Sequence, residues 1–324
     1  MANWIAVGIC AGLGAAVLQA AVLYPSPFTM VLFYLSALPI FIAALGWGVS
    51  AAALAGLSGG FAILAVAGAK PAFAFVIGVA VPPAILSWLA LRSRPADDAP
   101  PMEGEPQLNG LQWYPEGRLV LWAAALAAGL TSLVIVLVAP SIDSFREMLT
   151  DLLTQMLAVM RDEAQLESGQ LEQMVSVMTV LLPVAAASIW LLATLVNMKL
   201  GARLLSAFDR SPRPWARFGA LAFPRRAVWL LPLALASTML PGMLGLIGSV
   251  FAAAMFTAFA LAGLAVLHGL TEGMTARGLL LAALYTALIL LNWLLLVPLA
   301  VLTLLDMAFG MRARTVANLP ADRE

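Results

Sequence analysis

The sequence is poor in charged residues. Asp, Glu, Lys and Arg fill 10% of its 324 positions, whereas a soluble domain has about 25%. Hydrophobic residues fill 63%, well above the roughly 45–50% of soluble proteins. A water-soluble fold could not bury that much apolar surface, so composition excludes a soluble globular protein. The 17 acids equal the 17 bases in number, and this zero net charge gives no general attraction to nucleic acid.

Cysteine and histidine are almost absent. Cys10 is the single cysteine, which excludes an intrachain disulfide and a multi-cysteine metal site. It lies in an apolar run, where we expect it to pack as a small apolar side chain. His268 is the single histidine, so the chain has no HExxH motif and no Cys–His pair with a third orienting residue. We therefore expect no metal, no cofactor and no catalytic residue.

Long apolar runs fill most of the chain. About 20 apolar residues in a helix cross a bilayer core, because the backbone must satisfy its hydrogen bonds within the segment. The candidate runs are 3–23, 28–46, 48–68, 71–91, 118–139, 173–200, 228–242, 245–269 and 278–306. The first run follows no Lys or Arg and precedes no clear cleavage site, so we expect it to remain in the mature protein.

These runs predict an all-α fold, a polytopic transmembrane bundle of eight or nine membrane helices with one amphipathic interfacial helix. The number depends on the run 228–242, which is short for a full span. If it only dips into the membrane, eight helices cross and both termini lie in the cytoplasm. If it crosses, the C-terminus lies outside. The eight-helix arrangement agrees better with the arginines near the C-terminus.

Charge predicts the orientation. Residues 199–226, called the basic segment below, hold seven cations and one acid: Lys199, Arg203, Arg210, Arg213, Arg217, Arg225, Arg226 and Asp209. Because short basic loops stay in the cytoplasm, we expect this segment there. The acidic segment 141–170 should then be periplasmic or extracellular.

The acidic segment 141–170 has the pattern of an amphipathic helix. Its apolar residues recur every three or four positions: Ile142, Phe145, Leu149, Leu152, Met156 and Val159. We expect the helix to lie flat on the membrane or against the bundle. Three roles remain open for it: a plain connector, a lid over a cavity, or a docking surface.

The predicted domains follow from these segments. Residues 1–92 form an N-terminal four-helix membrane bundle, and 93–117, rich in Pro, Asp and Glu, form a flexible cytoplasmic loop. Residues 118–314 form a C-terminal membrane bundle that includes the helix 141–170, and 315–324 are a tail.

Small residues at four-residue spacing mark two helix-packing faces. In lipid, such ladders let helix backbones approach closely. One ladder comprises Gly8, Gly12, Ala16 and Ala20, and the other Gly48, Ala52, Gly56 and Gly60. They predict packing within the chain or, as the alternative, an interface with another membrane protein or a second copy.

Few polar side chains fall in or beside the apolar runs, and these are the candidate functional positions. They are Asn197, His268, Asn292, Asp306 and Arg312. Asp306 and Arg312 are six residues apart, so they can pair only if the helix ends between them. The alternative for each position is a structural role in joining neighbouring helices.

The residues Gly56-Leu57-Ser58-Gly59 match the GxSG signature of rhomboid-type intramembrane proteases, with His268 as a conceivable base. Rhomboids also use a second histidine, which this chain lacks. Gly56 already belongs to a packing ladder. Protease activity therefore remains only a remote alternative.

The C-terminal part resembles a known family. The elements that carry this resemblance are Leu181-Leu182-Pro183, a helix ending Leu195-Val196-Asn197-Met198-Lys199, Phe223-Pro224-Arg225, the stretch 261–268, and Leu304-Leu305-Asp306 before Arg312. Their order is similar to that of the DUF2232, or YybS-like, family of bacterial membrane proteins. The similarity is strongest over 170–314.

This resemblance implies a distant likeness to energy-coupling factor (ECF) transporters. The N-terminal helices look like their substrate-binding subunits, which hold a small molecule in a helical cavity and contact a coupling subunit through small-residue ladders. We therefore expect capture of a small, largely apolar solute. The alternative is a non-enzymatic scaffold or assembly factor of the cell envelope. Expected partners are the lipid bilayer and, for either function, another membrane protein or a second copy.

Overall fold

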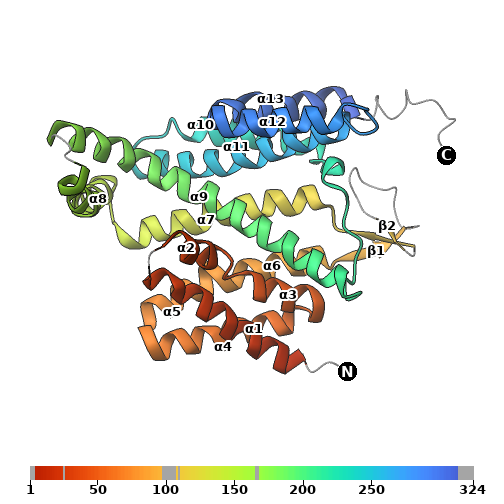
Figure 1. The fold of residues 1–324 in the computed structure, drawn as a ribbon, viewed down its shortest axis with the longest axis horizontal. Coiled ribbons are helices and arrows are strands. Elements are labelled where there is room, and N and C mark those ends of the chain that lie inside the picture. The colour runs from red at the N-terminus through yellow and green to blue at the C-terminus, as the bar shows by residue number, and fades with distance from the viewer. Residues whose placement is uncertain (1–3, 25, 97–106, 109, 165–167, 313–324) are drawn as a thin grey trace. The chain divides into compact units, whose positions relative to one another are not determined.

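The structure is a computed structural model that describes residues 4–24, 26–96, 107–108, 110–164 and 168–312. Helices dominate these residues (Figure 1). The elements before residue 114 are α1 (Trp4–Ala20), η1 (Ala21–Leu23), α2 (Pro27–Tyr34), α3 (Leu38–Trp47), α4 (Val49–Ala67), α5 (Ala69–Phe75), η2 (Val76–Ala80), α6 (Val81–Ala90), β1 (Ser93–Pro95), β2 (Gln107–Leu108) and β3 (Leu111–Trp113). The later elements are α7 (Glu116–Val138), α8 (Ile142–Ala164), α9 (Ser168–Ala207), η4 (Phe218–Ala220), η5 (Arg225–Trp229), α10 (Leu230–Ser237), α11 (Gly242–Leu270), α12 (Arg277–Leu291), η6 (Asn292–Leu295) and α13 (Leu296–Phe309).

The all-α membrane class is confirmed, but a count of eight or nine spans is not. In the described residues, seven helical stretches are long and apolar enough to cross a membrane: Trp4–Leu23, Pro27–Trp47, Val49–Ala67, Ala69–Ala90, Glu116–Val138, Glu172–Ala207 and Gly242–Leu270. The other two predicted runs are not among these seven. The run 228–242 contains the short helix α10, and the run 278–306 divides into α12 and α13 at η6.

The chain divides into two compact units. Unit 1 comprises residues 1–123, 192–227 and 258–324, and unit 2 comprises 124–191 and 228–257. The helices α7, α9 and α11 each pass from one unit into the other.

In unit 1, α1 packs along α4 through small residues. A Cβ added at Gly12 would lie 2.1 Å from the Ala55 carbonyl oxygen, and one at Gly8 would lie 2.9 Å from that of Ala51. Only glycine permits this approach, which brings one backbone against the other. The contact explains why the first ladder forms a packing face.

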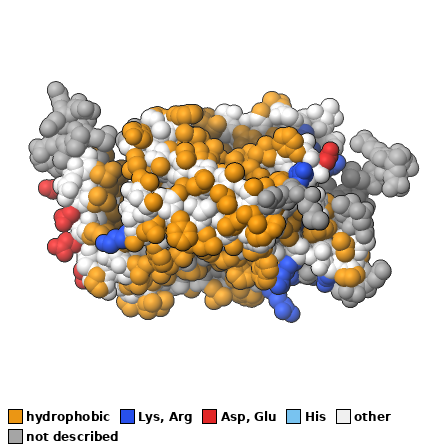
Figure 2. Space-filling model, turned by 90° about the horizontal axis from the view of Figure 1, so that it is seen from below, with side chains coloured by type: hydrophobic (Ala, Val, Ile, Leu, Met, Phe, Trp, Pro, Cys, Tyr) orange, Lys and Arg blue, Asp and Glu red, His pale blue; other side chains and the backbone are white. Residues whose placement is uncertain are grey.

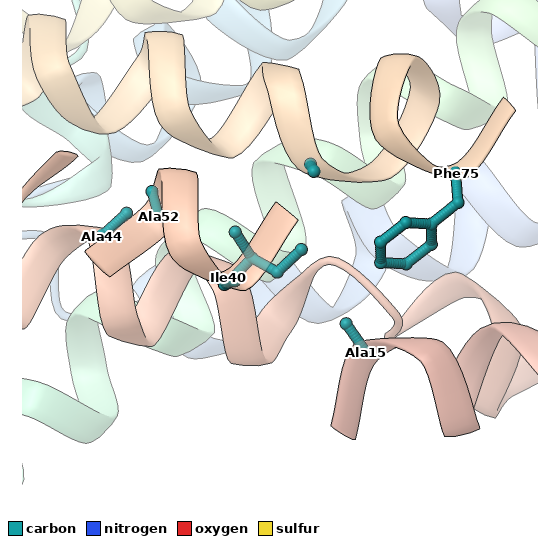
Figure 3. Close-up of a cluster of buried hydrophobic side chains, with 7 residues drawn as sticks. Ala15, Ile40, Ala44, Ala52 and Phe75 are labelled. Carbon is teal, nitrogen blue, oxygen red and sulfur yellow. The ribbon is translucent and has the colours of Figure 1, made fainter. Parts of the chain in front are cut away.

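The packing of α1, α3, α4 and the α5–α6 region encloses an alanine-rich core (Figure 3). Its large members are Ile40 and Phe75, which are 0% and 1% exposed. The remaining buried members are alanines: Ala15, Ala44, Ala52, Ala55 and Ala80. The two large side chains fill the space that the closely packed alanine faces leave.

Glycine and proline set where these helices turn. Gly48 and Gly68, with φ of 89° and 87°, separate α3 from α4 and α4 from α5. Such positive φ values favour glycine, which has no Cβ. The π-helical turn η2 ends just before Pro82 and Pro83. These prolines cannot donate backbone hydrogen bonds, which accounts for an irregular turn there.

The ends of the segment 93–117, expected to be a flexible loop, pair as short strands. β1 and β2 flank β3 in a three-stranded antiparallel sheet. Its central side chain, Gln112, is 1% exposed and accepts a hydrogen bond from Arg94 Nε at 2.9 Å. Residues 97–106 and 109 lie outside the described residues.

In unit 2, α8 confirms the expected amphipathic helix but changes its buried stripe. Phe145, Leu149 and Leu153 are buried, whereas Leu152 and Met156 are 49% and 62% exposed. The exposed Leu152 and Met156 of the predicted stripe are not buried against the protein, and they lie where a helix flat on the membrane would meet lipid. Leu152 follows Leu149 by three residues and Leu153 follows it by four, and both spacings are typical of one helix face. Sequence periodicity therefore did not distinguish Leu152 from Leu153.

Also in unit 2, α10 lies against the start of α11. A Cβ at Gly248 would lie 2.4 Å from the Ser237 carbonyl oxygen. Farther along α11, the Thr257 hydroxyl donates to Ser188 Oγ of α9 at 2.9 Å. These contacts hold α9, α10 and α11 together.

In unit 1, the last apolar run folds back. Gly263 of α11 closely approaches the Leu299 carbonyl oxygen of α13, and Thr303 Oγ1 donates to the Phe259 carbonyl oxygen at 2.6 Å. Arg312, after α13, lies near Gly269 at the end of α11. Because α12 also begins close after α11, the chain leaves this end of α11 through α12 and returns to it through α13.

Exposed apolar side chains cover most of the visible face in Figure 2. Val66, Met239 and Ile289 are 88%, 87% and 81% exposed. A soluble monomer rarely presents such extended apolar surface. These side chains therefore suit contact with lipid.

Candidate functional site

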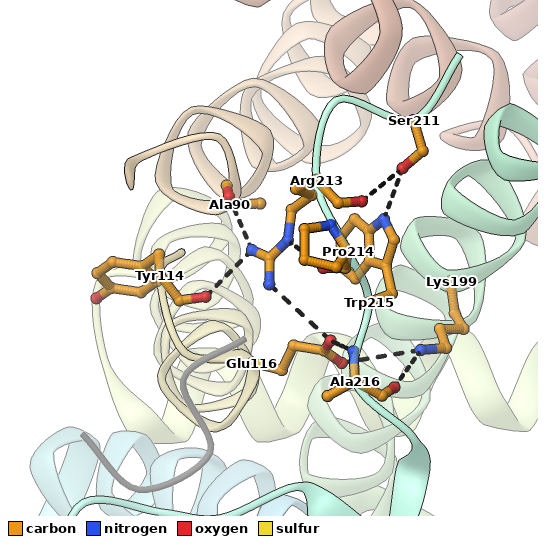
Figure 4. A network of polar contacts seen from close by, with 9 residues as sticks. All are labelled: Ala90, Tyr114, Glu116, Lys199, Ser211, Arg213, Pro214, Trp215 and Ala216. Atoms are coloured by element: carbon orange, nitrogen blue, oxygen red, sulfur yellow. Dashed lines mark hydrogen bonds and ion pairs between the residues drawn. The ribbon is translucent and has the colours of Figure 1, made fainter. Parts of the chain in front are cut away.

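The buried side chain of Arg213 holds the basic segment against irregular backbone (Figure 4). Its Nη1 donates to the carbonyl oxygen of Ala90, at 2.7 Å, and to that of Tyr114, at 3.1 Å. Ala90 ends α6, and Tyr114 lies just before α7. Because these residues lie at the end of α6 and before the start of α7, a continuing helix provides no N–H donor for either carbonyl. Arg213 supplies the hydrogen bonds instead.

Glu116, the first residue of α7, contacts the same segment. Its Oε1 accepts a hydrogen bond from the Ala216 backbone N–H at 2.5 Å and lies 3.9 Å from Arg213 Nη2. Its Oε2 lies 3.8 Å from Lys199 Nζ. The guanidinium of Arg213 also lies 4.5 Å from the centre of the Trp215 ring. We call Glu116, Lys199, Arg213 and Trp215 the Arg213 cluster.

Burial disfavours the charged form of Arg213. It lowers the pKa of Arg213 to about 10, while the nearby Glu116 carboxylate acts in the opposite direction. Arg213 therefore stays charged at neutral pH. Its Nη2 is buried without a hydrogen bond in the structure.

Asp306 and Arg312 pair directly, as they could only if α13 ended between them. Arg312 Nη2 and Nε donate to Asp306 Oδ2 at 2.7 and 2.9 Å. The helix ends at Phe309, and Gly310 follows with φ of 62°. Arg312 Nη1 also donates to the carbonyl oxygens of Gly219 and Leu221. The pair therefore joins the end of α13 to the basic segment.

Asn197 is 1% exposed and joins α9 to the break between α2 and α3. Its Nδ2 donates to the carbonyl oxygens of Tyr34, at 2.7 Å, and Ala193, at 2.8 Å. Leu38, four residues after Tyr34, donates to Leu35 instead, which leaves the Tyr34 carbonyl for Asn197. Its Oδ1 is buried without a partner.

His268 lies at the end of α11 beside aromatic rings. Its Nε2 and the Tyr285 hydroxyl are 2.9 Å apart, and its ring meets that of Phe218 edge to face at 5.2 Å. Asn292 begins η6, and its side chain lies outside the described part of the chain.

Three arginines and His268 line a depression of ≈ 390 Å³ in unit 1. This basic cavity is formed by Arg203, Arg217, Phe218, Gly219, His268, Glu272 and Arg277. Its one ion pair among the described residues joins Arg217 Nη1 to Glu272 Oε1 at 2.9 Å. The structure thus places one predicted candidate, His268, beside Arg203 and Arg217, which the sequence analysis used only to predict orientation, and beside Arg277, which it did not consider.

Unit 2 contains a cavity of ≈ 450 Å³ with mostly apolar walls. This apolar cavity is lined by Ile142, Phe145, Arg146, Thr179, Val180, Val184, Thr238, Leu240, Gly242, Gly245, Leu246 and Ser249. The first three belong to α8, the helix expected as a connector, lid or docking surface. None of the five predicted candidate positions lines it.

The polar groups of the apolar cavity are few. Thr179, Thr238 and Ser249 donate their hydroxyl protons to carbonyls of their own segments, at 2.8, 2.8 and 2.9 Å. Their oxygens can still accept hydrogen bonds from a ligand. Arg146 is exposed and adds one positive charge.

The two small-residue ladders pack largely within the chain. In the first, Gly8, Gly12 and Ala16 are buried, and Ala20 is exposed. In the second, Ala52, Gly56 and Gly60 are buried, the last two near Ala80 and Val76. Gly48 is half-buried. This packing leaves little of either ladder for a second protein.

Ser58 and His268 have separate partners. The Ser58 hydroxyl is 3.3 Å from the Ala55 carbonyl oxygen and 3.4 Å from that of Ile9, whereas His268 pairs with Tyr285. In the part of the chain that the structure describes, no group of three His, Cys, Asp or Glu side chains could hold a metal ion.

A family model described as a predicted membrane protein, DUF2232, matches residues 15–307. The chain belongs to the DUF2232 family. No curated protein and no solved structure matches it significantly. This membership agrees with the seven apolar helical stretches in identifying a membrane protein.

Proposed function

We propose that this DUF2232 protein captures a small, largely apolar solute in the apolar cavity and serves as a solute-binding component of a membrane transporter. The observation that carries the proposal is the cavity itself. Its ≈ 450 Å³ lies in the range of about 300–1,000 Å³ that is usual for ligand sites.

The wall chemistry indicates the kind of solute. Apolar side chains such as Val184 and Leu246 favour an apolar body. Three hydroxyl oxygens can accept hydrogen bonds, and Arg146 can pair with one anionic or polar group. A solute with an apolar body and a single such group fits this combination.

The amphipathic helix α8 has a role in this proposal as a lid. Phe145 is buried, and Ile142 and Arg146 line the cavity from the same helix. Outward movement of α8 would open that wall while α9 and α11 remain in place. This role is favoured over a plain connector because the helix contributes directly to the cavity.

We also place the protein in a bacterial inner membrane with the basic segment in the cytoplasm. The seven cations of that segment support this orientation. The acidic helix α8, and with it the apolar cavity, would then face the periplasm or exterior, where a solute for uptake arrives.

The test is mass spectrometry of small molecules released from protein purified in mild detergent. Val184→Trp should fill the cavity and abolish retention of the solute. Leu181→Trp, on the 56% exposed neighbouring position of α9, is the matched control and should retain it. Equal retention by both variants, or a stoichiometric protein in place of a solute, would contradict solute capture; the second result would favour a scaffold.

A further inference from the structure

We propose that the basic cavity binds a phosphate group. The chemistry is that of a phosphate mono- or diester, carried either by a lipid headgroup or by a small soluble molecule. This site is separate from the apolar cavity, because the two share no lining residue.

The first argument is convergence of positive charge from separate elements. Arg203 comes from α9, Arg217 precedes η4, and Arg277 begins α12. Residues 203, 217 and 277 are distant in sequence, so their proximity is a product of folding. Guanidinium groups are well suited to phosphate because their N–H groups can donate two parallel hydrogen bonds.

The second argument is an imbalance of charge within the cavity. Glu272 is its one carboxylate, and that carboxylate already pairs with Arg217. Arg203 and Arg277 have no ion-pair partner among the residues that the structure describes. An anion between them would offset their mutual repulsion.

The neighbouring groups add to this preference. Because α12 begins at Arg277, the positive end of its helix dipole lies at the cavity edge. Phe218 and His268 supply an aromatic wall for whatever organic group carries the phosphate. The volume of ≈ 390 Å³ accommodates more than a bare ion.

The experiment uses the full chain in lipid nanodiscs and in detergent. In the first arm, native mass spectrometry compares retention of phosphatidylglycerol with that of phosphatidylcholine. In the second arm, inorganic phosphate and pyrophosphate are titrated against delipidated protein while its thermal midpoint is followed. Selective retention of phosphatidylglycerol identifies a lipid source, and a rise in the midpoint with soluble phosphate identifies a soluble one.

The decisive variant is Arg203→Gln combined with Arg277→Gln. It should weaken phosphate or phosphatidylglycerol binding at least ten-fold, with restoration by the corresponding double Lys variant. The matched control, Arg225→Gln with Arg226→Gln, removes two exposed charges of the basic segment outside the cavity and should bind as the unchanged protein does. If the Gln double variant does not fold, Arg277→Gln alone is measured and should still weaken binding.

The proposal is overturned if neither arm shows binding, or if the control variant loses as much affinity as the cavity variant. Equal retention of the two lipids together with no response to soluble phosphate would have the same consequence.

Discussion

Three polar side chains of unit 1 share one task, which is to hydrogen-bond backbone carbonyls where helices are interrupted. Asn197 bonds the carbonyl of Tyr34, Arg213 bonds those of Ala90 and Tyr114, and Arg312 bonds those next to η4. In a lipid environment, an unsatisfied carbonyl costs several kcal/mol. A small number of polar residues can therefore determine where the chain may leave regular helix.

At this scale, Arg213 provides a test of stability. Arg213→Met should lower the free energy of unfolding by about 3–5 kcal/mol, because it leaves Glu116 and two carbonyls without their partner. Arg226→Met, which removes an exposed arginine of the same segment, should have little effect. Thermal unfolding in detergent measures both variants, and equal midpoints would contradict the structural role of Arg213.

The pH dependence of that stability has a definite sign. Burial lowers the pKa of Arg213 in the folded protein to about 10, below the ordinary pKa of an arginine. Above about pH 10 the folded state therefore binds fewer protons than the unfolded state, and the stability due to this group rises with pH only there. Between pH 6 and 9, thermal midpoints of the unchanged protein and Arg213→Met should differ by a constant amount. A difference that changes steadily across this range would contradict the assignment.

A substitution at Asp306 tests whether this residue has a structural or a functional role. Asp306→Asn removes the charge that pairs with Arg312, so accumulation in the membrane should fall, with a loss of stability of about 3 kcal/mol. Solute retained per folded molecule should not change, because Asp306 belongs to unit 1 and the apolar cavity to unit 2. Quantitative blotting and mass spectrometry give the two readouts; normal accumulation with lost retention would reverse this interpretation.

The sequence predicted the Asp306–Arg312 pair but not the contacts of Arg213, and the difference has a physical reason. Asp306 and Arg312 are close in sequence, and their pairing depended on one condition, a helix end, which Gly310 supplies. The partners of Arg213 are carbonyls 123 and 99 residues away. Any residue has a carbonyl, so these contacts leave no pattern in the sequence.

At the scale of helices, glycine decides how closely α1 and α4 pack. Gly12→Ala should destabilise the protein by about 1–3 kcal/mol, because its Cβ would lie 2.1 Å from both the Ala55 carbonyl oxygen and Ser58 Oγ. Gly14→Ala is the control on the same helix, since its nearest neighbour would be 3.9 Å away. Thermal midpoints in detergent compare the two; an unaffected Gly12→Ala would show that this contact is looser than described.

The helices themselves were largely predictable, because a long run of apolar residues is sufficient to predict a helix surrounded by lipid. The exceptions are informative. The run 278–306 divides at η6, just before Pro298, and a proline is tolerated in the first turn of a helix but not in its interior. Hydropathy alone did not show this division, because the run is apolar on both sides of it. On α8, spacing alone could not say which of the adjacent Leu152 and Leu153 faces the protein; the structure buries Leu153.

At the scale of the whole molecule, the return of α13 bears on the predicted topology. Arg312 bonds carbonyls beside η4, so the end of α13 and the basic segment lie together. The two sequence-based arrangements assumed that 278–306 was one crossing. With α12 and α13 as an outgoing and a returning leg, the C-terminus can share the side of the basic segment. The chain then passes from that segment to the start of α11 through residues 227–241, of which α10 is only a short helical part.

This arrangement gives a topology prediction. In a Cys10→Ala background, Met239→Cys in the exposed turn before α11 should react with a membrane-impermeant thiol reagent added to intact cells. Arg226→Cys should react only after permeabilisation, and a C-terminal reporter should be active in the cytoplasm. The physical basis is α11, which at 29 residues is about 43 Å long and separates its two ends by more than a bilayer core. Labelling of Arg226→Cys from outside would invert the orientation.

The short legs α12 and α13 affect the surrounding membrane. With 15 and 14 residues, each is about 22 Å long, whereas the hydrocarbon core is about 30 Å thick. Lipids beside this hairpin meet a thinner apolar belt than lipids beside α11, so the bilayer must become thinner there or the side chains at the hairpin ends must extend to the interface. Bilayers of short acyl chains should relieve that mismatch, which makes membrane thickness a physical variable to which this chain responds.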